Sequence, residues 1–425
     1  MVWFAADAGL DGDPENGTNP TATIAAMIGT TEYAFAAAGS KGNANITLLK
    51  STEIDGTTPT GFTYFENVSD FPAPALSDPS TNFQTVLYTG NGTAIGSGGK
   101  AVTFGGNSNM QPDIVMIKNR SQADSFANYD AARGVTKEFN MDDTNDEATV
   151  TEGLTTFGSD GFTVGSNVGV NTNTENYVAF GWSAGNSGAS NTDGTINTTS
   201  TFVDTTAGIS VSTYTGTGTD EATVGHGLGV APTVVWIIPR SNGDHHLSSN
   251  WRDGVSAFTE KIKLSSDEAA DSSDNQIDAA TSTTFQLGTD ANVNGSDRTY
   301  VAYCWVEKHG FSRFGTYTGN GNADGPFAWC GFKPAFVMVR PESRTDGWVM
   351  WDVERNTYNL TNLYLTMDSG NQEFTATVRI IDILSNGFKL KNGHNSVNNS
   401  GDFYIYMAFA DKPFGGSGGS PTTAR

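Results

Sequence analysis

Acidic residues and histidines in two places are of the types that metal ions bind. Asp11, Asp13 and Glu15 stand at alternate positions, a spacing that could place three carboxylates around a calcium ion. No complete calcium-loop signature follows them. His245 and His246 are adjacent, and neighbouring side chains of a strand point apart, so a zinc site would need a third ligand that the sequence does not identify. We therefore expect no bound cofactor, and calcium at the acidic group is the alternative left open.

Catalytic arrangements of side chains do not stand out from the sequence. With 46 acidic residues, too many chance pairs exist for the two carboxylates of a glycosidase to be selected. The glycine-rich segment 98–101 lacks the spacing of a phosphate-binding loop, and no Ser/His/Asp or Cys/His grouping is distinguishable. We therefore expect a protein that is not an enzyme, with a depolymerase of cell-surface polysaccharide as the alternative.

Two turn regions carry residue types that suit glycan binding. Segments 242–251 and 344–351 combine tryptophans with planar polar side chains, which match the apolar face and the hydroxyl groups of a pyranose ring. The candidate contact residues are Trp251, Trp348, Trp351, Asn242 and Asp346. The competing interpretation is that each tryptophan fills a hydrophobic core, which is the commoner role of this residue type.

The charge and the hydropathy pattern exclude some classes of partner. The formal net charge is −23, so a nucleic acid would be repelled. The first residues do not form a basic segment followed by an apolar stretch, and no run of about 18 apolar residues occurs. We therefore expect no nucleic-acid binding, no membrane insertion and no signal peptide.

The two cysteines are too few for a disulfide framework. Cys304 lies in the apolar segment 300–305, where a buried thiol is expected. A bridge between Cys304 and Cys330 is the alternative.

An internal repeat supplies the elements that must position these residues. The same landmarks occur three times in the same order: an opening Tyr-Thr-Gly motif, a proline that leads an apolar strand, an asparagine in a polar turn and an aromatic closing strand. They are residues 88–92, 214–218 and 317–321 for the opening, 112–117, 232–237 and 334–339 for the proline strand, Asn171, Asn294 and Asn398 for the turn, and 177–182, 300–305 and 404–409 for the closing strand. Their alternation and their aromatic and β-branched residues predict strands with one buried face.

The predicted fold class is therefore all-β, with three tandem antiparallel, jelly-roll-like β-sandwich repeats behind a partial N-terminal β domain. A composition rich in glycine, serine and asparagine indicates a linker after the first repeat and a flexible tail. The expected boundaries are residues 1–80 for the N-terminal region, 81–185, 208–310 and 311–414 for the repeats, 186–207 for the linker and 415–425 for the tail.

The repeat landmarks resemble a family of proteins from marine tailed bacteriophages, described mostly as phage structural or tail-fibre proteins. The resemblance covers about residues 80–415. Besides the opening motifs, it rests on YDAARGVTK (129–137), VGHGLGVAP (224–232), GFSRFG (310–315) and YIYMAFA (404–410). Residues 59–62 and 71–75 look like the trailing half of a SPRY or concanavalin-like sandwich, and a whole domain of that kind would need more chain upstream.

This resemblance implies a part of the virus particle, made in the host cytoplasm and placed in an external appendage such as a tail fibre. Its expected role is recognition of the host surface and adsorption, through a glycan or protein receptor. A purely structural part, such as a head decoration, a fibre shaft or a spacer, is the alternative. The expected partners are other virion proteins and further copies of the chain in a homo-oligomer, for which the family suggests a trimer.

Overall fold

The computed structural model describes residues 74–249, 260–270 and 276–413, which all belong to one unit, residues 73–425. Its strands pair antiparallel, and the α-helices among the described residues are single turns. These helices are α1 (Val168–Asn171), α2 (Ala291–Asn294) and α3 (Asn395–Asn398). The all-β class is thus confirmed, whereas Asp11, Asp13, Glu15, Trp251 and most of the N-terminal region lie outside the described residues.

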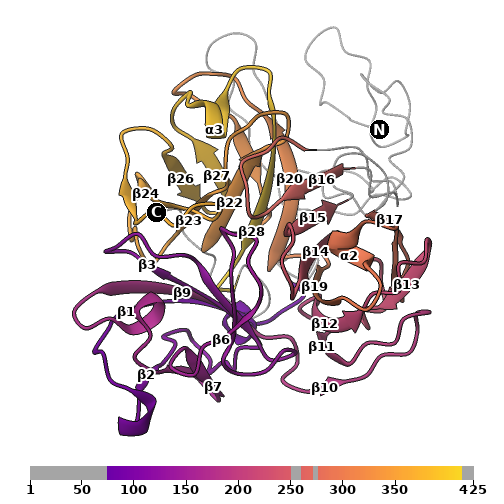
Figure 1. Ribbon diagram of the computed structural model, residues 1–425. Coiled ribbons are helices and arrows are strands. Elements are labelled where there is room, and N and C mark those ends of the chain that lie inside the picture. The colour runs from indigo at the N-terminus through magenta and orange to yellow at the C-terminus, as the bar shows by residue number, and fades with distance from the viewer. Residues whose placement is uncertain (1–73, 250–259, 271–275, 414–425) are drawn as a thin grey trace, which may run out of the picture. The chain divides into compact units, whose positions relative to one another are not determined.

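The first repeat runs from β1 to β9 and contains one large and one small sheet (Figure 1). The large sheet holds, in spatial order, β1 (Phe83–Thr89), β9 (Asn176–Trp182), β3 (Ile114–Asn119), β4 (Ala127–Asp130), β5 (Lys137–Asn140) and β6 (Ala148–Thr149). The small sheet holds β2 (Lys100–Val102), β8 (Gly161–Val164) and β7 (Leu154–Gly158). Two short 3-10 helices, η3 (Pro79–Thr81) and η4 (Ile95–Ser97), complete it.

The second and third repeats have the same arrangement. The second has β10 (Gly188–Ala189), β11 (Ser200–Asp204), β12 (Ile209–Thr215), β19 (Thr299–Trp305), β14 (Val234–Pro239), β15 (His246–Ser249) and β16 (Glu260–Lys263) in its large sheet, and β13 (Ala222–Gly225), β18 (Thr284–Leu287) and β17 (Ile277–Ala280) in its small sheet. The large sheet of the third repeat has β20 (Ser312–Thr318), β28 (Phe403–Phe409), β22 (Phe336–Pro341), β23 (Val349–Asp352), β24 (Leu363–Thr366) and β25 (Phe374–Thr375). Its small sheet has β21 (Phe327–Trp329), β27 (Gly387–Leu390) and β26 (Ile381–Leu384).

Residues 186–207 differ from the expected linker, because β10 and β11 extend the large sheet of the second repeat. Their small polar side chains pair with one another: the hydroxyl of Thr201 lies 2.8 Å from that of Thr198 and 2.9 Å from that of Ser212. A strand held by main-chain pairing and hydroxyl contacts needs few apolar residues, so its composition resembles that of a linker.

The repeated sequence landmarks meet inside each repeat. The opening tyrosine stacks on the first tyrosine of the closing strand, with ring centroids 5.1 Å apart in all three copies. The turn asparagine is fully buried, and its side chain joins the opening motif to the turn before the closing strand. In the first repeat, Asn171 Oδ1 accepts from the amide of Asn91 at 2.8 Å, and its Nδ2 donates to the carbonyl of Gly165 at 2.8 Å.

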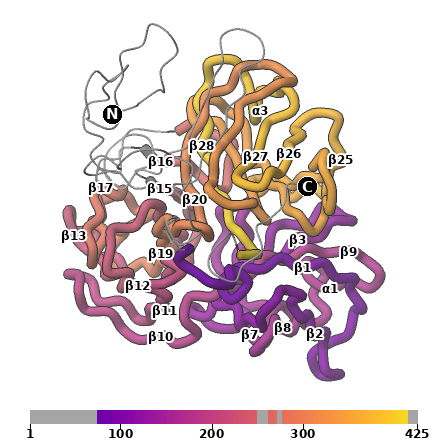
Figure 2. The backbone as a smooth tube through the Cα atoms, turned by 180° about the vertical axis from the view of Figure 1, so that it is seen from behind, coloured from indigo at the N-terminus to yellow at the C-terminus, as the bar shows by residue number. Residues whose placement is uncertain are grey.

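The three repeats close into a ring, in which each contacts both others (Figures 1 and 2). Each junction, called a seam here, uses the same main-chain hydrogen bond to the residue that follows β3, β14 or β22. These bonds run from Glu147 to Arg240 (2.9 Å), from Glu373 to Arg120 (3.3 Å) and from Ala270 to Glu342 (2.8 Å). Because equivalent positions meet at every seam, the repeats are related by an approximate threefold rotation, and this head-to-tail contact closes after three copies.

The centre of the ring is a hydrophobic core shared by all three repeats. It contains the last residues of the closing strands, Trp182, Trp305 and Phe409, together with Phe83 and Phe336. Separate clusters fill the space between the two sheets of the first and second repeats. The central strands of the large sheets are therefore buried on both faces, rather than on the one face that alternation predicts.

Candidate binding surface

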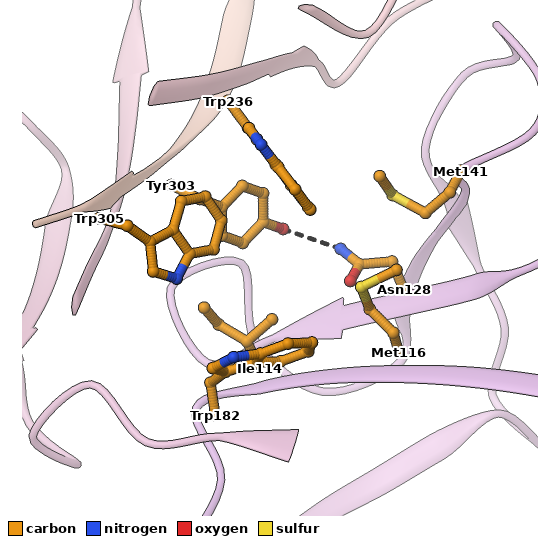
Figure 3. A pocket seen from close by; sticks show the side chains of 8 residues that line it. All are labelled: Ile114, Met116, Asn128, Met141, Trp182, Trp236, Tyr303 and Trp305. Atoms are coloured by element: carbon orange, nitrogen blue, oxygen red, sulfur yellow. Dashed lines mark hydrogen bonds between the residues drawn. The ribbon is translucent and has the colours of Figure 1, made fainter. Parts of the chain in front are cut away.

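A small cavity lies between the first and second repeats (Figure 3). Its lining residues are Ile114, Met116, Asn128, Met141, Trp182, Trp236, Tyr303 and Trp305. The cavity volume is about 10 Å3, which leaves room for a single water molecule and for no organic ligand. On its polar side, Asn128 Nδ2 donates to the hydroxyl of Tyr303 at 2.8 Å, and that hydroxyl donates to Asp130 Oδ2 at 2.6 Å.

Charged networks occupy two of the seams. Arg133 is fully buried and binds Asp130 of its own repeat, with Nε 2.5 Å from Oδ2. Glu147 then bridges Arg133 and Arg240 of the second repeat, at 3.2 and 2.7 Å. Burial alone would raise the pKa of Glu147, but its contacts with Arg240 and Arg133 hold it below its ordinary value. A carboxylate paired on both sides in this way stabilises a junction and is poorly placed to accept a proton from a substrate.

The third repeat repeats this network at its seam with the first. Asp352 pairs with the buried Arg355, and Glu373 links Arg355 to Arg120 of the first repeat, at 3.3 and 2.9 Å. The remaining seam has Ala270 and Glu342 in the equivalent positions. There the guanidinium of Arg340 donates to the main-chain carbonyls of Lys263 and Glu268 in the second repeat.

Two of the three tryptophans proposed to contact a glycan are core residues, and the third, Trp251, lies outside the described residues. Trp348 and Trp351 are each 0 % exposed. The indole of Trp348 lies under Arg340, 5.7 Å away, and donates to the carbonyl of Lys263 at 3.3 Å, while that of Trp351 donates to the carbonyl of Arg379 at 3.0 Å. Their position near turns suggested exposure, but the neighbouring repeat covers Trp348. The competing interpretation, a core role, holds for both.

The polar candidates lie in equivalent turns of different repeats. Asn242, between β14 and β15, is exposed, and its amide donates to Asp146 of the first repeat. Asp346, between β22 and β23, is partly buried and lies 3.6 Å from the guanidinium of Arg344. The two residues therefore belong to separate surfaces, and Asn242 serves a seam.

The two adjacent histidines do not converge on one ion. His245 packs against Phe139 of the first repeat with ring centroids 5.6 Å apart, whereas His246 faces Gln276 of its own repeat at 3.2 Å. Burial lowers the pKa of both rings to about 4, so both are neutral at pH 7. Among the residues that the structure describes, no group of three histidine, cysteine, aspartate or glutamate side chains could hold a metal.

A loop that the sequence pattern did not single out presents an aromatic ring to solvent. Tyr358 is 78 % exposed and belongs to residues 356–362, between β23 and β24. The first repeat spans the same interval, from the buried arginine to the next strand, with only residues 134–136. The third repeat thus carries an insertion of four residues, 7 − 3, and the unequal spacing after the Asp-x-x-Arg motif is the signal that could have revealed it.

Asparagine side chains hold this loop in place. Asn356 Oδ1 accepts from the amide of Asn362 at 3.0 Å. Asn359 pairs with Ile383 in β26, accepting from its amide at 2.9 Å and donating to its carbonyl at 2.8 Å. Four polar contacts of this kind, counting the bond from Leu363 to Asn356 at 2.6 Å, fix the base of the loop on both sides of the tyrosine.

A second loop lies beside the first. The amide of Ala376 donates to the carbonyl of Asn362 at 2.9 Å, and residues 361 and 381 form a bridge. Exposed residues of the two loops form what we call the Tyr358 surface: Thr357, Tyr358, Leu360, Thr377 and Val378. It combines an aromatic ring, two aliphatic side chains and two hydroxyl groups.

Three β-sandwich repeats closed by a common head-to-tail contact define the class of this protein: a triple-repeat all-β protein with pseudo-threefold symmetry. The family described as "Domain of unknown function (DUF7483)" matches residues 78–413, which include all three repeats, and the chain belongs to this family. No curated protein matches the chain. Within the described residues, each helix is too short or too polar to cross a membrane.

Proposed function

We propose that this protein is a non-enzymatic external component of a bacteriophage particle that binds the surface of the host cell. The observation that carries the proposal is the Tyr358 surface, an exposed aromatic site on a braced loop that only one of two comparable repeats possesses. Recognition residues commonly lie on loops held by a rigid scaffold, and the ring of repeats is such a scaffold. The resemblance of the repeat landmarks to phage tail-fibre and structural proteins supports the same role.

The buried carboxylates are not arranged for glycoside cleavage. Asp130, Asp352, Glu147 and Glu373 are paired with arginines, and the cavity at the first seam has room for one water. A depolymerase needs two carboxylates around a groove that admits a sugar chain. Neither the networks nor the cavity provides that arrangement in the described part of the chain.

A decorating role on the particle is the second candidate, and the pseudo-threefold ring favours it over a shaft. Repeats joined end to end would supply length, whereas here the head-to-tail contact is used to close a ring. Any homo-oligomer, including a trimer, would have to use surfaces other than the three seams.

The experiment measures binding of the purified full-length chain to intact cells of candidate hosts, with and without calcium. Saturable binding that competes with adsorption of the phage supports the adhesin role. A folded chain that labels the head of the particle and binds no cells supports decoration instead. Release of new reducing ends from isolated host polysaccharide would overturn the non-enzymatic assignment.

A further inference from the structure

We propose that the Tyr358 surface is a binding site for an uncharged glycan, in which the tyrosine ring stacks on the apolar face of a hexopyranose. This inference rests on the proposed function and names its ligand class and its site. Four lines of evidence carry it: the exposure of the ring, the rigidity of its loop, the charge around it and the size of the surface.

The exposure is unusual for this chain. Tyr358 is the most exposed large apolar side chain among the described residues, at 78 %, and the next are Val168 at 65 % and Leu360 at 50 %. Single exposed apolar residues are common on protein surfaces. Here, however, Leu360 and Val378 accompany the ring on two hydrogen-bonded loops, so the apolar groups are gathered rather than scattered.

The loop is organised before a ligand arrives. Asn359 anchors it to Ile383 through both its oxygen and its nitrogen, and Asn356 closes its far end. A tyrosine has only two side-chain torsions to fix, so a ring on a held loop loses little conformational entropy on binding. Thr357, next to the tyrosine in the chain, and Thr377, on the second loop, are both exposed, and hydroxyl groups of this kind can hydrogen-bond to sugar hydroxyls.

The charge of the chain selects against an anionic polysaccharide. The net charge is −23, and near the loop the exposed Glu354 adds to it. Lys391 is paired with Asp382 at 3.2 Å. Arg379, which follows Val378, donates to the neutral hydroxyls of Tyr364 and Ser396 and keeps its charge. Because the unneutralised guanidinium of Arg379 is partly buried and is set against Glu354 and a net charge of −23, an uncharged sugar is the more complementary ligand.

The size of the surface separates a glycan from a protein partner. Protein interfaces have a contiguous core in which aromatic anchors are surrounded by other apolar residues. The Tyr358 surface offers one ring, two aliphatic side chains and two exposed threonines. This matches the footprint of one or two sugar rings, whose faces are apolar and whose edges are polar.

The experiment compares the full-length protein with Tyr358→Ala, Tyr358→Trp and Val135→Ala. Val135 lies 41 % exposed in the equivalent, shorter loop of the first repeat and is the matched control. The probes are immobilised neutral hexose oligosaccharides and a sulfated oligosaccharide, with intact host cells measured in parallel. Melting temperatures test whether each variant is folded. We expect little change, because the replaced side chains are exposed.

We expect Tyr358→Ala to weaken binding to a neutral oligosaccharide about tenfold, Tyr358→Trp to keep or strengthen it, and Val135→Ala to leave it unchanged. Host binding that persists in Tyr358→Ala would refute this site while the proposed function stands. A wild-type protein that binds neither cells nor oligosaccharides would refute the proposed function itself. Binding to the sulfated probe alone, or loss of self-association in Tyr358→Ala, would also overturn the assignment to an uncharged glycan.

Discussion

The main-chain amide of Glu147 donates to the carbonyl oxygen of Arg240 at 2.9 Å, and the side chains of the same two residues pair at 2.7 Å. Glu373 and Arg120 repeat this double link between the third and first repeats, at 3.3 and 2.9 Å. The remaining seam keeps the main-chain bond, and Ala270 stands there in the position of Glu147 and Glu373. The first repeat is thus joined to both neighbours by charged contacts, and the stability of the ring should depend on them.

Glu147→Ala is expected to lower the free energy of unfolding by about 2–3 kcal/mol, because it removes a hydrogen-bonded carboxylate between two arginines, one of them fully buried. Urea denaturation at neutral pH measures this difference. The control is Asp324→Ala, which removes an ion pair with Lys389 on the surface, where Asp324 is 88 % exposed. Its unfolding curve should overlay that of the unmodified protein. Equal shifts in the two variants would contradict a special role of the seam.

The asparagine at the turn of each repeat leads to a second prediction. Asn171 is 0 % exposed and binds the opening motif and the turn before the closing strand. Asn171→Ala leaves the amide of Asn91 and the carbonyl of Gly165 without partners, at a cost of about 2–4 kcal/mol in unfolding free energy. Asn173, exposed in the same turn, supplies the control, since Asn173→Ala should change stability little. Thermal unfolding of the two variants makes the comparison, and similar melting temperatures would argue against the role assigned to Asn171.

The repeat could be predicted from the sequence because its landmarks are local. Motifs such as Asn171 and the tyrosines that stack on one another recur in order and depend on contacts inside one repeat. The ring could not be predicted, because its ion pairs join residues 93 and 253 positions apart and leave no pattern in any short segment. The error over Trp348 has the same origin: its exposure is decided by a neighbouring repeat whose position the sequence does not show.

The burial of His245 predicts acid sensitivity at the seam between the first and second repeats. Burial lowers its pKa to about 4, while Asp143 and Asp244 oppose this shift and His246 and Arg133 add to it. In the unfolded chain a histidine titrates near pH 6.5, so between about pH 6.5 and 4 the unfolded state binds more protons. The free energy of unfolding is therefore unaffected by this histidine above about pH 6.5. It decreases as the pH falls from there toward 4, by at most on the order of 3 kcal/mol.

His245→Phe isolates this contribution, since Phe126 occupies the equivalent position of the first repeat. The variant should unfold at a urea concentration close to that of the unmodified protein at pH 7.5, and at a clearly higher one at pH 4.5. Burial raises the pKa of Asp113 to about 6, which acts in the opposite direction in the same range. Asp113 is present in both proteins, so the difference between them reports His245. Parallel pH profiles would exclude the histidine as the cause.

The thiols of Cys304 and Cys330 are free and buried, which excludes the disulfide alternative in this fold. Burial raises the pKa of Cys304 to about 12 and raises that of Cys330 as well, and the thiolate is the form that reacts with disulfide reagents. We expect the native protein at pH 8 to react at least about a hundredfold more slowly than the unfolded chain, which should expose both thiols.

Reaction with an aromatic disulfide reagent, followed by absorbance with and without denaturant, measures this protection. Cys304 belongs to the second repeat and Cys330 to the third, so Cys304→Ala and Cys330→Ala assign each rate to one repeat. If the ring opens as a unit, the two thiols should react at the same slow rate, and Glu147→Ala should accelerate both. Rapid reaction of one thiol alone would show instead that its repeat opens independently, and that the shared core contributes less to cooperativity than its burial implies.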